Sequence, residues 1–368
     1  MNTGLAVPPA RRAALLRMTP WGEQRHGGAL RSEQIAALVS AALPDAVHIA
    51  APYPRGLPPH RLAGLALRGG VAALTSLRSP LQSGFGFWLE RSLKPAMLQR
   101  GDLLIYDADP RYGPALMRVA ARRGLRTLVL PHNIEALIPK TWPIVVDPQA
   151  TARALQAEVS WLARADEVWT IGVLDRDLLA LFGITTAQLP YAPPDARRRE
   201  LLAVRAARRP VIDAPLLVVG TVHNSPTRAG MLEQLEMARP LGMPVVVAGF
   251  GTEILRDRAG EGVTIMGAQP WSGLADLMAA ARALWVHQTP MSGALTRIPE
   301  ALIAGLPVIA NHWAARGHGP LDGLRVYANA DDLRSLVAAP PVTVALPATP
   351  AAEADFIAAL RRAAGVAP

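Results

Sequence analysis

The chain of 368 residues contains no cysteine. Disulfide bridges, a thiol nucleophile and cysteine-based zinc sites are therefore excluded, and the composition favours a reducing compartment. No apolar run reaches the roughly 18 residues of a membrane-spanning helix, and prolines and arginines interrupt residues 1–20, where a signal peptide needs an apolar stretch. We therefore expect a cytoplasmic protein, either free in solution or peripheral at the inner face of the membrane.

Several motifs for metal-dependent or nucleotide chemistry are also missing. The sequence has no HExxH zinc motif, no P-loop and no paired histidine cluster. We therefore expect a reaction that needs no cofactor and no metal. Hydrophobic residues make up 51% of the chain and charged residues 18%, which indicates a globular protein, and its length favours two domains over one.

Lysine is almost absent, since only Lys94 and Lys140 accompany the arginines. The formal net charge is +9, and residues 1–100 hold nearly all of it, with twelve basic side chains against four acidic ones. Between residues 61 and 100 basic residues alternate with apolar ones, and Glu90 is the only acid. Such a segment can lie on an anionic membrane, which we expect for residues 61–100. An arginine-rich coding bias is the second explanation. Nucleic acid is a distant third, because no recognition motif accompanies the charge.

Short apolar runs of strand length alternate with helical patterns along the chain, as in parallel sheets covered on both faces. Pro190, Pro193 and Pro194 interrupt the alternation, and a highly charged stretch follows before it resumes. We therefore predict an α/β protein with two doubly wound, Rossmann-like domains. The predicted segments are a first domain (1–194), a linker (195–212), a second domain (213–350) and a C-terminal helix that packs back toward the first domain (351–368).

The most informative stretch covers residues 291–311, MSGALTRIPEALIAGLPVIAN. Small residues around Gly293 leave N–H groups free at the start of a predicted helix, where they and the helix dipole can face an anion. Arg297 lies three positions before Glu300, so both side chains share one helix face. Gly305 ends the helix, and a buried strand follows. The same pattern also describes an ordinary corner of a doubly wound sheet, where the two charged residues would be a solvated pair.

This stretch resembles the nucleotide-sugar site of the family-four-like GT-B glycosyltransferases. In that family a Gly-rich loop, a basic residue and a glutamate three positions later precede Ala, Gly, Pro-Val and a buried strand. The chain departs from the pattern at Ser292, where the family often has a first glutamate eight residues before the second. The resemblance implies two Rossmann-like domains that face each other across a cleft. The first would bind the acceptor, and the second a nucleotide-diphosphate sugar.

The resemblance also implies which residues bind the donor. Arg228 falls where the family has a Lys or Arg for the diphosphate, and arginine can hold phosphate oxygens with two parallel hydrogen bonds. Gly249 and Gly251 resemble the turn that lies under the nucleotide base, and Glu300 would accept hydrogen bonds from the ribose hydroxyls. The expected donor-binding residues are Gly220, Arg228, Gly249, Gly251, Ser292, Gly293, Ala294, Leu295, Thr296, Arg297 and Glu300.

Loops that follow strands of the first domain are the candidates for the acceptor side, because ligands sit at the carboxyl ends of parallel strands. The loop that ends in His26, Gly27 and Gly28 resembles the family's Gly-rich first loop, and a plain turn explains it equally well. Asp107 and Asp109 follow another predicted strand. They could bind acceptor hydroxyls or act as a base, or they could simply form a turn before proline.

The strongest loop of the first domain is His132, Asn133, Ile134 and Glu135. It resembles the H-[DN]-x-E corner of many family members, in which the histidine lies beside the transferred sugar. A neutral imidazole can accept a hydrogen bond from a sugar hydroxyl or shuttle a proton near pH 7. We therefore predict His132 and Glu300 as catalytic residues, and Asn133 and Glu135 as acceptor-side residues.

Together these features predict a glycosyltransferase that moves a sugar from a nucleotide-sugar donor to a glycan or lipid-linked acceptor, in polysaccharide or glycoconjugate synthesis. The family likeness implies retention of the anomeric configuration. Two alternatives stay open. One is a nucleotide-sugar epimerase of the same architecture, and the other is a catalytically silent nucleotide-binding scaffold, which the serine at position 292 favours.

Overall fold

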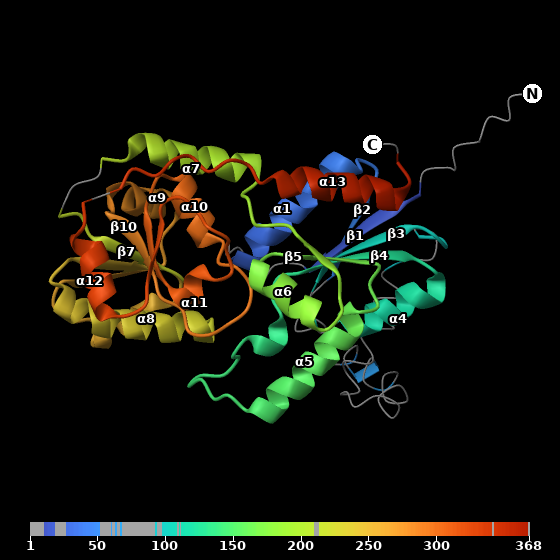
Figure 1. Ribbon diagram of the computed structural model, residues 1–368, viewed down its shortest axis with the longest axis horizontal. Coiled ribbons are helices and arrows are strands. Elements are labelled where there is room, and N and C mark those ends of the chain that lie inside the picture. Colours follow the sequence, from blue (N-terminus) through green and yellow to red (C-terminus); the bar gives the residue numbers. More distant parts are fainter. Residues whose placement is uncertain are drawn as a thin grey trace, which may run out of the picture.

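The computed structural model describes residues 11–18, 27–51, 60, 63–64, 67, 93, 98–108, 110, 112–209, 213–340 and 342–366. It contains two α/β domains that lie side by side along the long axis of the molecule, each with one parallel sheet between layers of helices (Figure 1). This arrangement confirms the predicted fold class.

The first sheet has six strands in the order β2-β1-β3-β4-β5-β6, and all its pairings are parallel. Its central strands are buried on both faces: Leu15 in β1 packs toward one helical layer, while Leu16 packs toward the other. The strands are β1 (Ala13–Met18), β2 (Val47–Ala51), β3 (Leu103–Ala108), β4 (Arg126–Pro131), β5 (Glu167–Thr170) and β6 (Thr186–Gln188).

Helices cover both faces of the first sheet. Ile35 of α1 and Phe356 of α13 belong to the core on one face, and Leu116 of α4 and Trp161 of α5 belong to the core on the other. The helices around this sheet are α1 (Gly27–Ala42), α4 (Gly113–Arg123), the short 3-10 helix η2 (Glu135–Leu137), α5 (Pro148–Leu162), α6 (Val173–Leu181) and α13 (Ala351–Ala364).

The second sheet also has six parallel strands, in the order β12-β11-β10-β7-β8-β9. This is the Rossmann strand order: successive strands are added to one side of β7 up to β9, and then to its other side from β10 onward. The change of side between β7 and β10, called the reversal point below, leaves a crevice at their carboxyl ends. The strands are β7 (Leu216–Val219), β8 (Val245–Ala248), β9 (Val263–Gly267), β10 (Ala283–Val286), β11 (Val308–Asn311) and β12 (Leu324–Tyr327).

Helices again form two layers. One layer holds α7 (Asp195–Ala207), α9 (Trp271–Ala280) and α10 (Arg297–Ile303), and the other holds α8 (Ser225–Ala238) and α12 (Ala330–Ala338). Shorter helices are η3 (Arg239–Leu241), η4 (Thr252–Arg258) and α11 (His312–Ala315).

The chain passes between the domains twice, near α7 and near α13. The helix α7 lies on the second domain, where Arg205 donates hydrogen bonds to the carbonyls of Leu302 and Ile303 at the end of α10. The last helix, α13, returns to the first domain and packs against α1 (Figure 1). Gly305, with φ of 73°, follows α10 and turns the chain into β11.

Two local expectations were wrong. The helix expected to begin near Gly293 begins at Arg297, because residues 291–296 form a loop that packs against the first domain. Gly27 and Gly28 are the first residues of α1 and are not in the loop before it. A Cβ on Gly27 would lie 2.9 Å from Oγ1 of Thr296, so the absence of a side chain lets the second domain approach this helix end.

Candidate functional site

The candidate site lies where carboxyl-end loops of the two sheets meet. From the first domain come the loop after β4, around His132 and Ile134, and the start of α6 at Asp175. From the second come the loops around Gly293 and Gly317. A Cβ on Gly293 would collide with Oδ1 of Asn133, so glycine permits this close approach between domains.

Ser292 joins the two domains. Its Oγ accepts a hydrogen bond from the Ile134 backbone N–H at 2.6 Å and lies 3.0 Å from the Ile134 carbonyl oxygen, to which it donates. The side chain is almost fully buried, with 1% of its surface exposed. Its hydroxyl is therefore engaged with the first domain, and Ser292 belongs to the loop predicted to bind the donor.

Asp175 reaches the same loop from the first domain. Its Oδ1 accepts a hydrogen bond from the Gly293 N–H at 3.2 Å, and only 1% of the residue is exposed. Burial raises the pKa of Asp175 to about 6, although hydrogen bonds from Gly293 and Ser292 and the charge of Arg316 oppose that rise. Sequence reasoning missed this residue, because a single aspartate at the start of a helix is usually only a local cap.

Arg297 lies at the reversal point of the second sheet. Its Nη2 donates to Oε1 of Gln288 at 3.1 Å, and Asn311 holds the Gln288 backbone with two hydrogen bonds. A Cβ on Gly220 would lie 2.9 Å from Nη1 of Arg297, so the guanidinium passes close to this glycine. Among the described residues no carboxylate pairs with Arg297, its Nε has no partner, and burial lowers its pKa to about 10.

Arg228, the second predicted diphosphate ligand, lies near the start of α8. Its guanidinium carbon is 4.6 Å from the ring centre of Trp142, which the first domain contributes, and its buried Nε has no hydrogen-bond partner in the part of the chain that the structure describes. Thr227, the neighbouring residue, lies against Gly220. Arg228 therefore follows a residue that contacts the glycine turn beside Arg297.

Glu300 is held by two residues that the sequence did not point to. Arg197 of α7 donates to both carboxylate oxygens, from Nε to Oε1 at 3.0 Å and from Nη2 to Oε2 at 2.8 Å. The Tyr191 hydroxyl donates to Oε1 at 2.9 Å. Burial by itself would lower the pKa of Arg197, but the hydrogen bonds and charge of Glu300, followed by those of Glu200, raise it.

This arrangement makes Glu300 a structural anchor for the crossover between domains, since Tyr191 precedes α7 and Arg197 belongs to it. A carboxylate has about four lone-pair positions, and three are used, so Oε2 can still accept one further hydrogen bond. The solvated pair of Arg297 and Glu300 that an ordinary sheet corner would give does not form, because Glu300 pairs with Arg197.

Asp107, near the end of β3, and His132, in the loop after β4, come together. His132 Nε2 and Asp107 Oδ1 form a short hydrogen bond, and the Ser32 hydroxyl donates to the other oxygen of Asp107. Asp107 is 2% exposed, whereas the side chain of His132 is 24% exposed. The buried carboxylate thus fixes the orientation of a partly exposed ring.

Asn133 and Glu135 mainly stabilise this loop. Asn133 Nδ2 donates to Oε1 of Glu135 at 3.2 Å, and Lys140 lies 3.4 Å from the other oxygen of that carboxylate. Glu158 of α5 accepts hydrogen bonds from the N–H groups of Glu135 and Ala136, which caps η2, and burial raises its pKa to about 7. Glu158 therefore holds the loop after β4 against α5.

The glycines of the predicted base-binding turn have left-handed backbones. Gly249 has φ of 140° and Gly251 has φ of 76°, and a Cβ on Gly249 would collide with the carbonyl of Gly220. Phe250 between them is 42% exposed, and its ring centre lies 4.8 Å from that of His223. An exposed aromatic pair thus borders this turn.

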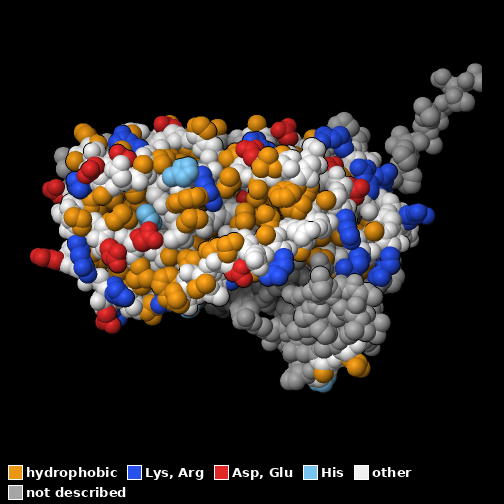
Figure 2. All heavy atoms as spheres, turned by 60° about the horizontal axis from the view of Figure 1, so that its bottom comes forward, with side chains coloured by type: hydrophobic (Ala, Val, Ile, Leu, Met, Phe, Trp, Pro, Cys, Tyr) orange, Lys and Arg blue, Asp and Glu red, His pale blue; other side chains and the backbone are white. Residues whose placement is uncertain are grey.

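Some predicted residues cannot be placed. His26 and Asp109 lie outside the described residues, as does most of the segment 61–100 that we expect at a membrane. A cluster of cations lies on α4 and just after α5: the pKa of Arg118 is lowered, first by burial and then by the charges of Arg164 and Arg122. Figure 2 shows basic side chains along the end of the first domain, and mixed charges over the second. None of the described helices has the length and apolarity that crossing a bilayer requires.

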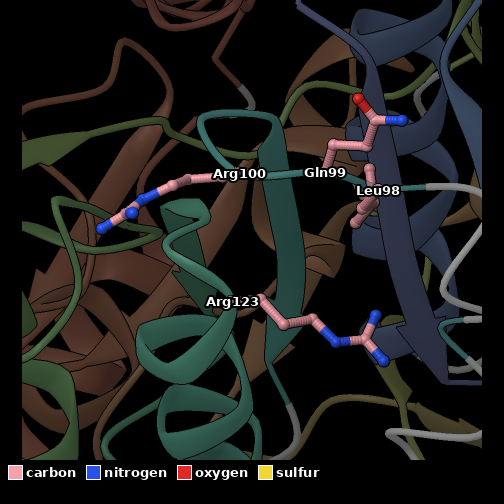
Figure 3. A pocket seen from close by; sticks show the side chains of 4 residues that line it. All are labelled: Leu98, Gln99, Arg100 and Arg123. Carbon is pink, nitrogen blue, oxygen red and sulfur yellow. The ribbon is translucent and has the colours of Figure 1, made fainter.

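A hollow in the first domain lies away from this cleft. Leu98, Gln99, Arg100 and Arg123 line it, before β3 begins and where α4 ends, and the two arginines extend in opposite directions (Figure 3). This is the amino-terminal edge of the sheet, whereas ligands of doubly wound sheets bind at the carboxyl edge. We therefore assign no function to it.

His318, beside the donor loop, gives a testable pH dependence. Burial lowers its pKa to about 4, although a hydrogen bond with the Leu295 carbonyl opposes the shift. Its buried Nε2 has no hydrogen-bond partner among the residues described above. Because the pKa is lower in the folded state than in the unfolded one, the free energy of unfolding is highest above about pH 6.5 and decreases as the pH falls toward about 4. Because the residue keeps some exposure, we expect wild type to lose about 1–2 kcal/mol relative to His318→Gln between pH 7.5 and pH 4.5.

Urea unfolding at both pH values measures this difference. His312→Gln is the matched control, since His312 is exposed and lies in the same segment. An unchanged stability gap between wild type and His318→Gln at the two pH values would contradict the prediction.

Comparison with known proteins gives a structural match only. No protein-family model matches the chain, and neither does any curated protein sequence. Among solved structures, α,α-trehalose-6-phosphate synthase from Burkholderia multivorans is similar with a TM-score of 0.59 and 15% identity, covering 97% of this chain and 95% of that one. Anabaena HepE in complex with UDP and glucose is similar with a TM-score of 0.54 and 12% identity, covering 89% of each chain. These likenesses and the two facing Rossmann-like sheets show that the chain has the GT-B fold of glycosyltransferases.

Proposed function

We propose that the protein is a glycosyltransferase that transfers a sugar from a nucleotide-diphosphate sugar to a glycan or lipid-linked acceptor. The observation that carries this proposal is Arg297, a cation at the reversal point of the second sheet that has no carboxylate partner among the described residues. Withdrawing a cation from water without an anion is unfavourable. A diphosphate bound beside Gly220 would supply the missing negative charge.

The surrounding residues suit a nucleotide diphosphate. Arg228 follows Thr227, which contacts Gly220, and offers a second cation. Paired arginines can stabilise the negative charge that develops on a leaving diphosphate. Asn224 caps α8 through the Thr227 N–H, so this helix begins beside the glycine turn. Gly249 and Gly251 leave space at the expected position of the base, and the free position on Oε2 of Glu300 suits one ribose hydroxyl.

His132 is the best candidate for a residue next to the reacting sugar. Asp107 holds one ring nitrogen, so the other can accept a hydrogen bond from a sugar hydroxyl or take up a proton. The first domain then supplies the acceptor side, as proposed for Asn133 and Glu135. We further propose retention of the anomeric configuration, which rests on the family resemblance.

The direct test is a thermal-shift screen of wild type against UDP, GDP, ADP and CDP and the corresponding nucleotide sugars, followed by detection of released nucleoside diphosphate with and without sugar acceptors. HepE was crystallised with UDP and glucose, so UDP is the first probe. We expect one nucleotide series to raise Tm selectively, by about 3–8 °C at saturating concentration. Turnover would exclude a silent scaffold, and transfer to an acceptor would exclude an epimerase. No shift with any nucleotide at millimolar concentration would overturn the proposal.

A further inference from the structure

The loop that resembles a donor site lacks a carboxylate of its own at position 292, and the structure places one beside that position from the other domain. Asp175 lies in the first turn of α6, and its Oδ1 is 3.2 Å from the N–H of Gly293, the residue after Ser292. No other carboxylate among the described residues shares a hydrogen bond with this loop.

The environment of Asp175 is unusual for an aspartate that only starts a helix. It is 1% exposed, while Asp177, two residues later, has a side chain that is 64% exposed and pairs with Arg176. Arg316 is the cation whose charge acts on Asp175, and Arg316 itself donates to the Met291 carbonyl in the same loop. A buried carboxylate directed across a domain boundary is unfavourable unless it has a use there.

Asp175 also has hydrogen-bonding capacity left. Its Oδ1 accepts one backbone N–H, and the single proton of the Ser292 hydroxyl serves either Asp175 or the Ile134 carbonyl. A carboxylate can accept about four hydrogen bonds, so at least two positions remain for hydroxyl donors. Carboxylates that accept from two hydroxyls are a usual means of binding a sugar ring.

We propose that Asp175 is the sugar-binding carboxylate of the donor site, supplied by the first domain in place of the glutamate that Ser292 replaces. This inference rests on the proposed function, because it requires a nucleotide-sugar donor. It adds that the sugar subsite exists only while the two domains are in contact, since Gly293 and Asp175 come from different domains. The nucleotide part of the donor needs only the second domain.

The test compares Asp175→Asn with the matched control Asp177→Asn. Asparagine keeps an acceptor oxygen for the Gly293 N–H, so the contact between domains is retained and both variants should fold with a Tm near that of wild type. Calorimetric titrations measure Kd for UDP and for UDP-glucose, or for the nucleotide and nucleotide sugar that the screen selects. Initial rates give kcat and KM.

We expect Asp175→Asn to bind the nucleoside diphosphate within about twofold of wild type and to lose about 10- to 100-fold in kcat/KM, the range expected when hydrogen bonds to a charged group are lost. Its Kd for the nucleotide sugar should rise by a similar factor. Asp177→Asn should match wild type in every measurement. A purely structural role would instead affect nucleoside diphosphate and nucleotide sugar equally, and would overturn the inference.

An Asp175→Asn enzyme with wild-type kinetics would also overturn it. If wild type itself binds no nucleotide, the proposed function fails, and that result is distinct from either outcome for Asp175. Should Asp175→Asn lower Tm strongly, Asp175→Glu keeps the carboxylate and provides the second comparison. Recovery of nucleotide-sugar selectivity in that variant supports the inference, and equal weakening of both ligands contradicts it.

Discussion

Replacing Arg297 with methionine is expected to weaken nucleotide binding by about 100-fold, because truncating a charge that pairs with a buried anion typically costs 2 kcal/mol or more. In the absence of ligand the same change should stabilise the protein. Burial lowers the pKa of Arg297 to about 10, which means that the folded state disfavours its charge. Since part of the residue is exposed, the expected gain is about 1 kcal/mol. Thermal unfolding with and without the selected nucleoside diphosphate measures both effects.

Arg208→Met is the matched control for this prediction. Burial also lowers the pKa of Arg208 to about 10, but its guanidinium donates to the carbonyls of Met278 and Ala281 at the end of α9. Its loss should therefore lower stability and leave nucleotide affinity unchanged. An Arg297→Met variant that is destabilised like Arg208→Met, or that retains nucleotide affinity, would show that Arg297 is a structural cation.

Glu300→Ala is expected to be strongly destabilising. The substitution leaves the guanidinium of Arg197 and the hydroxyl of Tyr191 without their shared acceptor, and breaking a buried ion pair from one side costs about 3–5 kcal/mol. For a domain of this size the corresponding fall in Tm is about 10 °C. Differential scanning calorimetry measures it, and any loss of nucleotide affinity must be judged against this loss of stability.

Two further variants separate the ion pair from simple loss of contacts. Glu200→Ala removes the partly exposed partner of Arg197 and should cost less than about 1 kcal/mol. The double variant Arg197→Met/Glu300→Met removes both buried charges and should recover most of the stability that Glu300→Ala loses, because an apolar pair replaces buried ions at little net cost. A Glu300→Ala protein that melts within about 2 °C of wild type would contradict this account.

Much of the fold could be predicted from local patterns. Apolar runs such as Leu103–Tyr106 and Val308–Ala310 are strands buried on both faces, as the alternation of apolar runs with helical patterns predicts. The short strands β6 and β12 were missed, because each has few residues and a partly exposed face. Such strands depend on their neighbours in the sheet more than on their own sequence.

Part of the candidate site could be predicted in the same way. Asp107 lies near the end of β3 and His132 follows β4, and parallel topology brings the carboxyl ends of those strands to one edge. The sequence did not indicate which residue each charged side chain pairs with. The spacing of Arg297 three positions before Glu300 places both side chains on one helix face, yet Glu300 pairs with Arg197, about a hundred positions earlier. Spacing along the chain cannot predict an ion-pair partner that comes from another helix or strand.

The sequence by itself determined the fold class, the position of the loops at the carboxyl ends of the strands, and the glycines that allow close approach, because these follow from periodicity and backbone sterics within a few residues. Only the tertiary structure decided which charges are compensated. Arg197 neutralises Glu300, Asp175 enters the donor loop from the opposite domain, and Arg297 has no acidic partner among the described residues. Electrostatic compensation depends on distance and burial in the folded chain, and both are set by the contact between two domains that are far apart in sequence.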